Sequence, residues 1–351
     1  MKKEHILVIR FSALGDVAMV VPVVWSLAHQ YPDLRITVLS RGFARSFFED
    51  LAPNVGFMEA DLKREYRGIK GLNALYRRLT AKQFTAIADL HNVLRSEFLR
   101  MRFNIGRYHV AHIDKHRKGR RRLTSQNNKQ LVQQPTSFEN YSAVFSQLGY
   151  PIRHDFKSIF PPEGGDLSLL PESLKCQLSI VNCQLIGIAP FAAHKGKVYP
   201  PELMQQVIEQ LIGQHPEARI FLFGRGQQEE EWFTRWCQQH SQCTYIGKHI
   251  DSMRQELILM SHLRVMLSMD SANMHLASLT GIPVVSVWGA THPYAGFMGW
   301  GQSADRVIQT DLDCRPCSIF GQKVCRRGDY ACLYQIKPET IVEKLNTFIT
   351  N

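Results

Sequence analysis

The sequence predicts an α/β protein built from two units, each with its own parallel β-sheet. Short runs rich in β-branched residues alternate along the chain with amphipathic stretches of helical periodicity. The chain has 351 residues, which is long for a single hydrophobic core. A turn-rich stretch containing Pro161, Pro162, Gly164 and Gly165 separates two such alternating halves.

The first half, residues 1–162, is expected to form one domain. Its strands are expected at residues 5–9, 35–39, 55–59, 85–89 and 105–111. Helices fit between and after these strands at residues 22–30, 44–51, 68–82, 93–102 and 137–148. Pro22 suits a first helical turn, where its missing N–H group costs nothing.

The second half, residues 163–335, is expected to form the other domain. Its strands are expected at residues 185–189, 219–223, 244–246, 264–268, 284–288 and 306–309. Helices are expected at residues 201–214, 227–240, 251–261 and 272–280, with a final helix at 338–348. Parallel sheets of this kind bind ligands beyond the carboxyl ends of their strands.

Composition limits the class of partner and the compartment. Lys and Arg number 42 against 31 Asp and Glu, a net charge of +11 that indicates a nucleotide, phosphorylated sugar, nucleic acid or acidic membrane surface. The longest apolar run, residues 17–28, contains Pro22 and is too short to span a bilayer. The N-terminus lacks the apolar region of a signal peptide, so we expect a cytoplasmic protein. Its eight cysteines should then be reduced or metal-bound.

Two junctions between a strand and a helix carry candidate site residues. Asp270 and Ser271 follow one strand, where the N-terminus of a helix can bind a diphosphate. The alternative is that one of them only caps the helix. Asp16 follows the first strand, where it can act as a general base, or simply cap the next helix.

Three further junctions are ambiguous in the same way. Lys197 can neutralise a phosphate, although a solvated lysine pair with Lys195 is the alternative. Glu229 can hold a ribose, or complement the dipole of the helix that it begins. The glycines just before it match neither the dinucleotide-binding nor the P-loop pattern. His91 and Arg95 can contact a ligand, although a lone histidine is more often structural.

Two clusters lie outside these junctions. The first is expected to be a loop that binds anionic headgroups or nucleic acid, or that is simply solvated. It lacks the aromatic residues typical of proteins that bind single-stranded nucleic acid. Its basic residues are Lys115, Arg117, Lys118, Arg120, Arg121 and Arg122. The second cluster can be a structural zinc site or reduced thiols packed in a loop. Its members are Cys314, Cys317, Cys325 and Cys332.

Four segments, taken in order, resemble glycosyltransferase family 9, the ADP-heptose:lipopolysaccharide heptosyltransferases. They are residues 10–16, 189–200, 270–277 and 287–291. The resemblance implies the GT-B fold, in which two Rossmann-like domains face a cleft and the second one holds the sugar nucleotide. It also implies that the last segment, residues 336–351, returns to the N-terminal domain.

The resemblance assigns roles to residues of this chain. It implies that Asp16 is the general base and that the donor is held mainly at the second sheet. The implied donor-binding residues are Lys197, Glu229, Asp270, Ser271, Ala272, His275 and Thr291. For the acceptor we expect contacts from Ser12, His91, Arg95 and Arg120.

The activity implied is inverting transfer of a heptose from a nucleoside-diphosphate sugar, expected to be ADP-heptose, to the inner core of lipopolysaccharide. Neither a metal nor another cofactor is implied, and no nucleic-acid partner. The expected partners are the donor, an anionic glycolipid acceptor and the inner leaflet of the membrane, where the protein would bind peripherally. The alternatives are a transferase of the same fold with another nucleotide sugar and acceptor, and a non-catalytic protein that binds anionic ligands. Ala192 and Ala193 stand where the family commonly has Thr or Ser, which leaves the donor's identity open.

Overall fold

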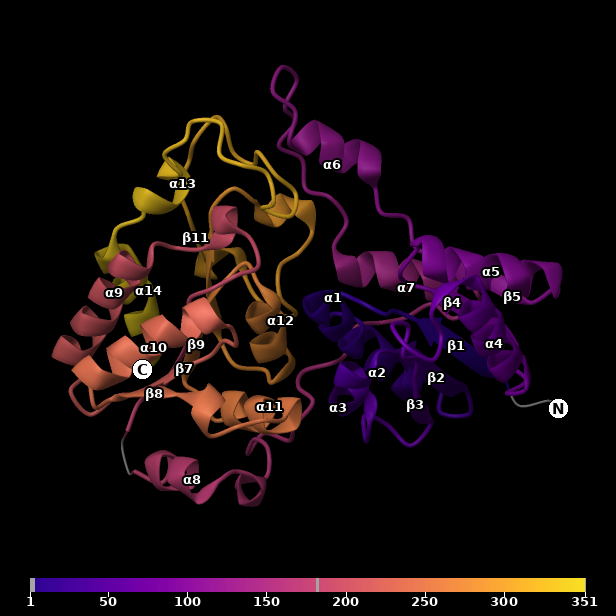
Figure 1. Cartoon of the computed structure of the whole chain (residues 1–351), viewed down its shortest axis with the longest axis horizontal. Coiled ribbons are helices and arrows are strands. Elements are labelled where there is room, and N and C mark those ends of the chain that lie inside the picture. The colour runs from indigo at the N-terminus through magenta and orange to yellow at the C-terminus, as the bar shows by residue number, and fades with distance from the viewer. Residues whose placement is uncertain (1–3, 181–182, 351) are drawn as a thin grey trace. The chain divides into compact units, whose positions relative to one another are not determined.

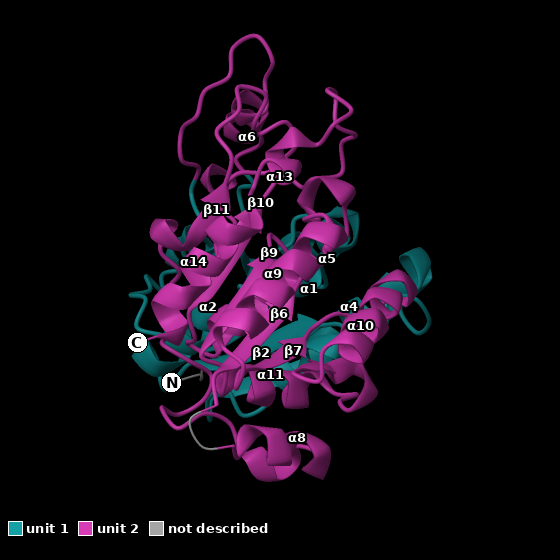
Figure 2. Cartoon of the chain, turned by 90° about the vertical axis from the view of Figure 1, so that its left-hand side faces the viewer, with its two compact units in different colours: residues 1–115, 135–156 teal, residues 116–134, 157–351 magenta. Residues whose placement is uncertain are grey.

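The computed structural model describes residues 4–180 and 183–350. The chain divides into two compact units, coloured separately in Figure 2. The first unit contains residues 1–115 and 135–156, and the second contains residues 116–134 and 157–351. Each unit has one parallel sheet, so the predicted α/β class is confirmed.

The sheet of the first unit has five strands in the order β3-β2-β1-β4-β5. They are β1 (His5–Ile9), β2 (Arg35–Ser40), β3 (Val55–Glu59), β4 (Ala86–Asp89) and β5 (His109–His112). Every residue of the central strands β1 and β4 is buried, as expected for parallel strands that are covered on both faces. The chain moves outward from β1 to β3 and then crosses to β4. The point where the order reverses therefore lies between β1 and β4.

Helices connect these strands (Figure 1). They are α1 (Leu14–Ala18), α2 (Val21–Gln30), η1 (Gly42–Ala44), α3 (Arg45–Phe48), α4 (Gly68–Thr80), α5 (Leu94–Ile105) and α7 (Ser137–Gln147). Helix α7 begins with a capping box, in which Thr136 Oγ1 accepts a hydrogen bond from the N–H of Glu139 and the Glu139 carboxylate accepts one from Thr136.

The second unit has six strands in the order β11-β10-β9-β6-β7-β8. They are β6 (Leu185–Ala189), β7 (Arg219–Leu222), β8 (Cys243–Tyr245), β9 (Val265–Met269), β10 (Val284–Trp288) and β11 (Val307–Gln309). The order reverses between β6 and β9, so the second sheet repeats the topology of the first. We call the carboxyl end of each reversal a switch point.

The helices and 3₁₀ turns of the second unit surround its sheet. The helices are α6 (Arg117–Leu123), α8 (Glu172–Leu178), α9 (Pro201–Gln214), α10 (Gln227–Gln239), α11 (Met253–Ser261), α12 (Ala272–Leu279), α13 (Ala331–Tyr334) and α14 (Pro338–Ile349). The 3₁₀ turns are η2 (Leu167–Leu169), η3 (Lys195–Lys197), η4 (Ile246–Lys248), η5 (Pro293–Ala295) and η6 (Ala304–Arg306). None of the helices in the described parts of the chain is long and apolar enough to cross a membrane.

The domain boundary differs from the expected one at residue 162. The chain enters the second unit for residues 116–134, returns to the first for 135–156, and leaves it again at residue 157. We call residues 116–134 the strap. Lys129 fixes it by donating hydrogen bonds to the carbonyl oxygens of Asp313 and Arg315, at 2.6 and 2.9 Å. The N–H of Gln134 also bonds the Tyr294 carbonyl at 2.8 Å.

The expectation that residues 336–351 return to the first domain is wrong for the described part of that segment. Helix α14 packs against α9 and β9 of the second unit. Its buried residues Ile341, Val342, Leu345 and Ile349 belong to the hydrophobic core of that unit. The apolar face of the helix is therefore used within its own unit.

Several local expectations are also corrected. The strand expected at 105–111 is shorter, because Ile105 is the last residue of α5 and β5 begins at His109. The short helices α1, α8 and α13 were not expected. The basic cluster, expected to be a loop, forms helix α6 within the strap.

Candidate active site

The switch point of the first unit brings three predicted residues together. Ser12 and Asp16 follow β1, and His91 follows β4, the neighbouring strand. The Ser12 hydroxyl lies 3.4 Å from His91 Nε2. Arg95 lies further along, in the first turn of α5, and its side chain is exposed.

Asp16 sits in the first turn of α1, where it caps the helix. Its Oδ2 accepts a hydrogen bond from the N–H of Ala13 at 3.1 Å, as a helix-capping carboxylate does. The same oxygen lies 2.7 Å from Nη2 of Arg10. The side chain of Asp16 remains 32% exposed, so solvent or a ligand can reach it. A capping carboxylate that stays accessible can still take a proton.

Arg10 is the residue of this site to which the sequence gave no role. Its guanidinium is buried and donates to the Leu90 carbonyl at 2.7 Å. It lies 5.9 Å from the ring centre of Tyr141, whose hydroxyl donates to the backbone oxygen of Asp16 at 3.2 Å. Its signal in the sequence is an arginine directly after a fully apolar strand. Such a buried charge needs a fixed partner, which here is Asp16.

His91 is held neutral by its surroundings. Burial, together with the positive charge of Arg10, lowers its pKa from 6.5 to about 3. The backbone N–H of His91 donates a hydrogen bond to Asp89 Oδ1 at 2.9 Å, and the other carboxylate oxygen of Asp89 pairs with Arg100 at 3.1 Å. Neutral imidazole in a fixed turn can exchange hydrogen bonds with a sugar hydroxyl without adding charge.

The switch point of the second unit brings together a lysine, a carboxylate and a threonine. Lys197 follows β6, Asp270 follows β9, and Thr291 follows β10. Lys197 Nζ lies 2.8 Å from Asp270 Oδ2, and Thr291 donates to the same oxygen at 2.8 Å. Asp270 is only 3% exposed and Lys197 14%. Since an ammonium group has three N–H donors, the pair leaves donors on Lys197 for a phosphate.

The start of helix α12 lies at the same switch point. Ser271 is its N-cap by position, but its side chain makes no capping hydrogen bond and lies 3.3 Å from the hydroxyl of Ser268. The side-chain cap considered from the sequence is therefore wrong for Ser271. Ala272 is the first helical residue, and His275 is buried one turn later. The dipole of α12 makes this N-terminus suitable for an anion.

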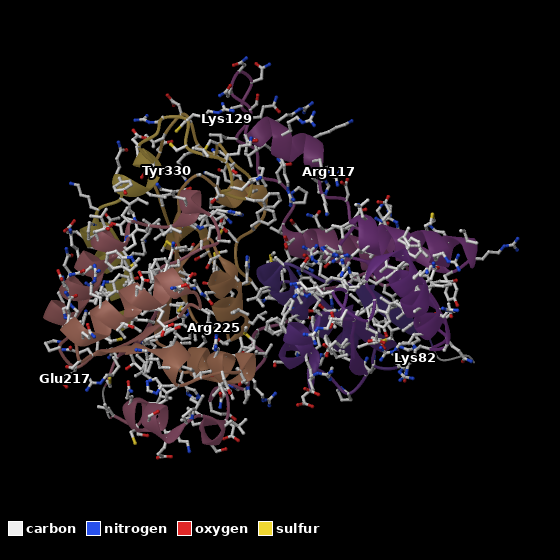
Figure 3. All side chains as sticks on the ribbon, viewed as in Figure 1. Lys82, Arg117, Lys129, Glu217, Arg225 and Tyr330 are labelled. Atoms are coloured by element: carbon white, nitrogen blue, oxygen red, sulfur yellow. The ribbon has the colours of Figure 1, made fainter. Side chains whose placement is uncertain are left out.

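Glu229 lies in the first turn of α10, the helix that follows β7, and β7 is the neighbour of β6 in the sheet. Its carboxylate packs so closely over the loop that a Cβ on Gly224 would collide with it. Burial raises the pKa of Glu229, and a hydrogen bond from the N–H of Arg225 opposes that rise. Arg225, which is labelled in Figure 3, donates hydrogen bonds to the buried carboxylate of Glu256 and to the carbonyl oxygen of Ile250.

Arg315 is a second residue that the sequence did not single out. Its guanidinium is buried and donates to the carbonyl oxygens of Gly289, Trp288 and Thr291. It also bonds Thr310 O and Gln309 Oε1, so it ties the turn after β10 to the end of β11. A sequence signal was lacking, because most of these partners lie more than 20 residues away.

Close backbone contact tightens the same region. The N–H of Ala290 donates to the Gly196 carbonyl at 2.8 Å. A Cβ on Gly289 would lie 2.5 Å from that carbonyl oxygen, so only glycine fits. The loop carrying Lys197 and the turn carrying Thr291 therefore form one rigid assembly.

Arg120 belongs to the second unit, whereas the other predicted acceptor residues belong to the first. Its guanidinium lies 4.5 Å from the ring centre of Phe297 and is half-buried. The exposed basic residues of α6 are Arg117, Lys118, Arg121 and Arg122. Figure 3 labels Arg117 of α6 and Lys129, which lies further along the strap.

The four clustered cysteines are free thiols. Cys332 packs into the hydrophobic core of the second unit, and Cys314 is exposed. Burial, followed by the neighbouring Cys314 and Cys325, raises the pKa of Cys317. Among the described residues, no three His, Cys, Asp or Glu side chains are placed to hold a metal ion together. Of the two interpretations, this arrangement favours packed thiols.

Comparison with known families gives one match, to the model for glycosyltransferase family 9 (heptosyltransferase), over residues 72–326. Among curated proteins, lipooligosaccharide heptosyltransferase 2 of Campylobacter jejuni is 23% identical over 189 residues. That alignment covers 52% of this chain and 57% of the relative, so the chain spans little more than half the length of the relatives it matches.

Solved structures of similar fold cover nearly the whole chain. E. coli heptosyltransferase WaaC with ADP gives a TM-score of 0.68 at 16% identity, covering 98% of this chain and 99% of that one. E. coli ADP-heptose lps heptosyltransferase II gives 0.67 at 19% identity, with 99% and 98% covered. A family 9 glycosyltransferase from Veillonella parvula gives 0.70 at 18% identity, with 100% and 98% covered. These likenesses confirm the GT-B fold class.

Proposed function

The chain belongs to glycosyltransferase family 9, and on that premise we propose that it transfers a heptose or related sugar from a nucleoside-diphosphate sugar, ADP-heptose, to an inner-core lipopolysaccharide acceptor. The observation that carries the proposal is the pairing at the first switch point of an accessible carboxylate, Asp16, with a buried arginine. A donor site of matching chemistry, with Lys197 and the start of α12, lies at the second switch point. The ADP complex of WaaC supports a nucleotide-sugar donor by analogy.

In the proposed reaction, an acceptor hydroxyl oxygen attacks the anomeric carbon and its proton passes to Asp16. The new glycosidic bond forms as the bond to the diphosphate breaks on the opposite face, so the configuration inverts. The bonding electron pair leaves with the nucleoside diphosphate, where negative charge accumulates. Arg10 orients Asp16 before the reaction through the contact of 2.7 Å between its Nη2 and Asp16 Oδ2.

Stabilisation of the leaving diphosphate falls to the second unit. Lys197 supplies a mobile ammonium group, and the N-terminus of α12 supplies backbone N–H groups at Ser271 and Ala272. Asp270 and Thr291 hold Lys197 in position, and His275 is buried one turn into α12. Glu229, in the first turn of α10, binds the ribose hydroxyls. With these positive groups the proposal requires no metal ion.

We assign acceptor binding to Ser12, His91 and Arg95 in the first unit and to the basic face around Arg120 in the strap. The acceptor is an anionic glycolipid, so the protein would act at the inner leaflet of the cytoplasmic membrane. Replacing the exposed Arg121 and Arg122 by Ser should weaken acceptor binding, while Arg120→Ser would also remove the contact with Phe297. Unchanged acceptor affinity in the double variant would remove the strap from the proposal.

The first experiment is a thermal-shift screen with ADP-, UDP- and GDP-sugars, because a ligand bound to the folded state raises the melting temperature. The proposal expects the largest shift with ADP-heptose. Ala192 and Ala193 stand where the family commonly has Thr or Ser, so another nucleotide sugar is the alternative that the screen includes. A larger shift with a UDP- or GDP-sugar would establish that alternative. Donor binding without transfer to any glycolipid acceptor would favour a non-catalytic binding protein.

A further inference from the structure

Helix α5 of the first unit presents an apolar stripe to solvent. Leu94 is 85% exposed, Met101 50% and Ile105 72%. These residues and the half-buried Phe98 are spaced at i, i+4, i+7 and i+11, so they line one face of the helix. The stripe spans about 16 Å at the rise of an α-helix.

The core uses little of this stripe, because only the half-buried Phe98 packs against it. The opposite face of α5 supplies the buried residues Leu99 and Phe103, which pack in the core with α4 and β4. The helix therefore has two apolar faces, one toward the sheet and one toward solvent. A soluble helix normally has only the first, and contiguous apolar surface on the second indicates an interaction site.

The charges around the stripe restrict the partner. Helices α4 and α5 pack side by side, and together they contain six basic residues and one acidic residue. The acidic one, Glu97, lies 3.5 Å from Arg100 of the same helix. Arg95 is exposed next to Leu94 in the sequence, and the half-buried Arg102 lies over the ring of Tyr76 at 4.9 Å. Arginines next to an apolar stripe suit the boundary between lipid tails and anionic headgroups.

From these observations we propose that the exposed face of α5 docks onto an anionic lipid bilayer. Leu94, Met101 and Ile105 enter the headgroup region, and Arg95 and Arg102 pair with lipid phosphates. A second copy of the chain fits less well, because a symmetric contact through this face would bring its basic residues together. The inference deepens the proposed function, on which its biological meaning rests, because the first turn of α5 adjoins the acceptor residues His91 and Arg95.

The test is co-sedimentation of the full chain with vesicles of phosphatidylcholine, alone or mixed with phosphatidylglycerol. We expect binding to the mixed vesicles that falls as salt rises, since salt screens the arginine contribution. A triple variant, Leu94→Ser, Met101→Ser and Ile105→Ser, should lose roughly tenfold or more in vesicle affinity, because the apolar area that enters the bilayer is removed. All three positions are exposed, so the variant should keep the wild-type circular dichroism spectrum and melting temperature.

Two control variants make the result specific to α5. Val324→Ser and Leu169→Ser remove exposed apolar side chains, 81% and 44% exposed, from the second unit and should leave vesicle affinity unchanged. Met101→Leu keeps the stripe apolar and should also bind as the wild type does. Arg102→Gln should weaken binding to the mixed vesicles and reduce its dependence on salt.

Wild-type affinity in the triple variant would overturn the proposal, as would absence of vesicle binding by the wild type. If the wild type is a dimer, the triple variant is a monomer and vesicle binding is unchanged, the stripe mediates self-association instead. Transfer to a delipidated, water-soluble acceptor separates this proposal from the proposed function. Docking variants should retain that transfer, whereas its absence in the wild type would refute the transferase while leaving the docking result intact.

Discussion

The two switch points contain nearly the same ion pair in two different environments. In the first unit Asp16 lies 2.7 Å from Arg10, and in the second Asp270 lies 2.8 Å from Lys197. In the first pair the cation is buried and the carboxylate is 32% exposed. In the second pair the carboxylate is 3% exposed and holds a lysine that is 14% exposed. Burial, not composition, therefore determines which partner of each pair can meet a ligand: the carboxylate in the first unit and the ammonium group in the second.

The sharpest test of this difference is Asp16→Asn. The amide keeps the shape of the side chain but cannot take the acceptor proton, so we expect kcat to fall by roughly 10²- to 10⁴-fold. Donor affinity should change little, and the melting temperature should fall only slightly, because the amide oxygen introduced at position 16 can still accept a hydrogen bond from the buried Arg10. Steady-state transfer assays and calorimetric titration of the donor measure both. The exposed Asp251→Asn is the matched control, and transfer by Asp16→Asn at the wild-type rate would refute the general base.

Removal of the carboxylate from the other pair should lower the stability of the fold. Asp270→Ala leaves Lys197 with little solvent and no carboxylate, and breaking a buried pair in this way costs about 3 kcal/mol or more. We expect a clear drop in the melting temperature of the second unit, together with weaker donor binding, measured by differential scanning calorimetry. If Asp270→Ala melted like the wild type while Asp16→Asn was destabilised, the contrast between the two pairs would be reversed.

Arg315→Lys tests whether the donor side depends on a fixed backbone. Lysine keeps the charge but cannot reach five acceptors at once, so buried carbonyl oxygens lose their donors, at a cost of about 2 kcal/mol. We expect lower stability and a donor affinity reduced by roughly tenfold, with Asp16-dependent chemistry unchanged once donor is saturating. The readout is the split between KM for the donor and kcat. A lower kcat with unchanged KM would contradict a positioning role.

Acid denaturation compares one histidine from each unit. Burial and Arg10 lower the pKa of His91 to about 3, and burial and Arg315 lower that of His292 to about 4. The unfolded chain binds a proton at each histidine below about pH 6.5, whereas the folded chain does not. Their stabilising contributions are therefore complete above pH 6.5 and are lost as the pH falls toward 3 and 4.

Each histidine should steepen the loss of stability by at most about 1.4 kcal/mol per pH unit. His91→Gln should accordingly flatten the curve of unfolding free energy against pH between about 6.5 and 3, and His292→Gln between about 6.5 and 4. Urea denaturation at a series of pH values measures both slopes. Identical slopes for wild type and His91→Gln would show that His91 is not held neutral in the folded state.

The sequence predicts those elements and residues that a local residue pattern determines. The continuous apolar runs of β1, β6 and β10 were placed at their observed bounds, because strands buried on both faces need such runs. Asp16 and Lys197 were singled out because they lie in the segments that come after such strands. The strand order then places both at switch points, and no local pattern carries that order.

What the sequence missed is fixed by distant contacts. Helix α6 buries only Leu123 of its seven residues, so it lacks the apolar periodicity that would have predicted it. Arg10 and Arg315 were read as motif members without roles, because their partners Asp16, Tyr141 and Gly289 become neighbours only in the folded chain. Ile105 was assigned to a strand because an exposed apolar residue at the end of a helix looks the same in sequence as the start of a strand.

The strap has a practical consequence for dissecting this protein. Since the polypeptide passes between the two units at three points, near residues 115, 134 and 156, no single cut yields two self-contained fragments. A truncated gene ending at residue 156 would encode the strap without Asp313 and Arg315, whose carbonyl oxygens accept hydrogen bonds from Lys129. Expression of either half in isolation therefore calls for a redesigned connection from Lys115 to Pro135, with the excised piece grafted onto the other half.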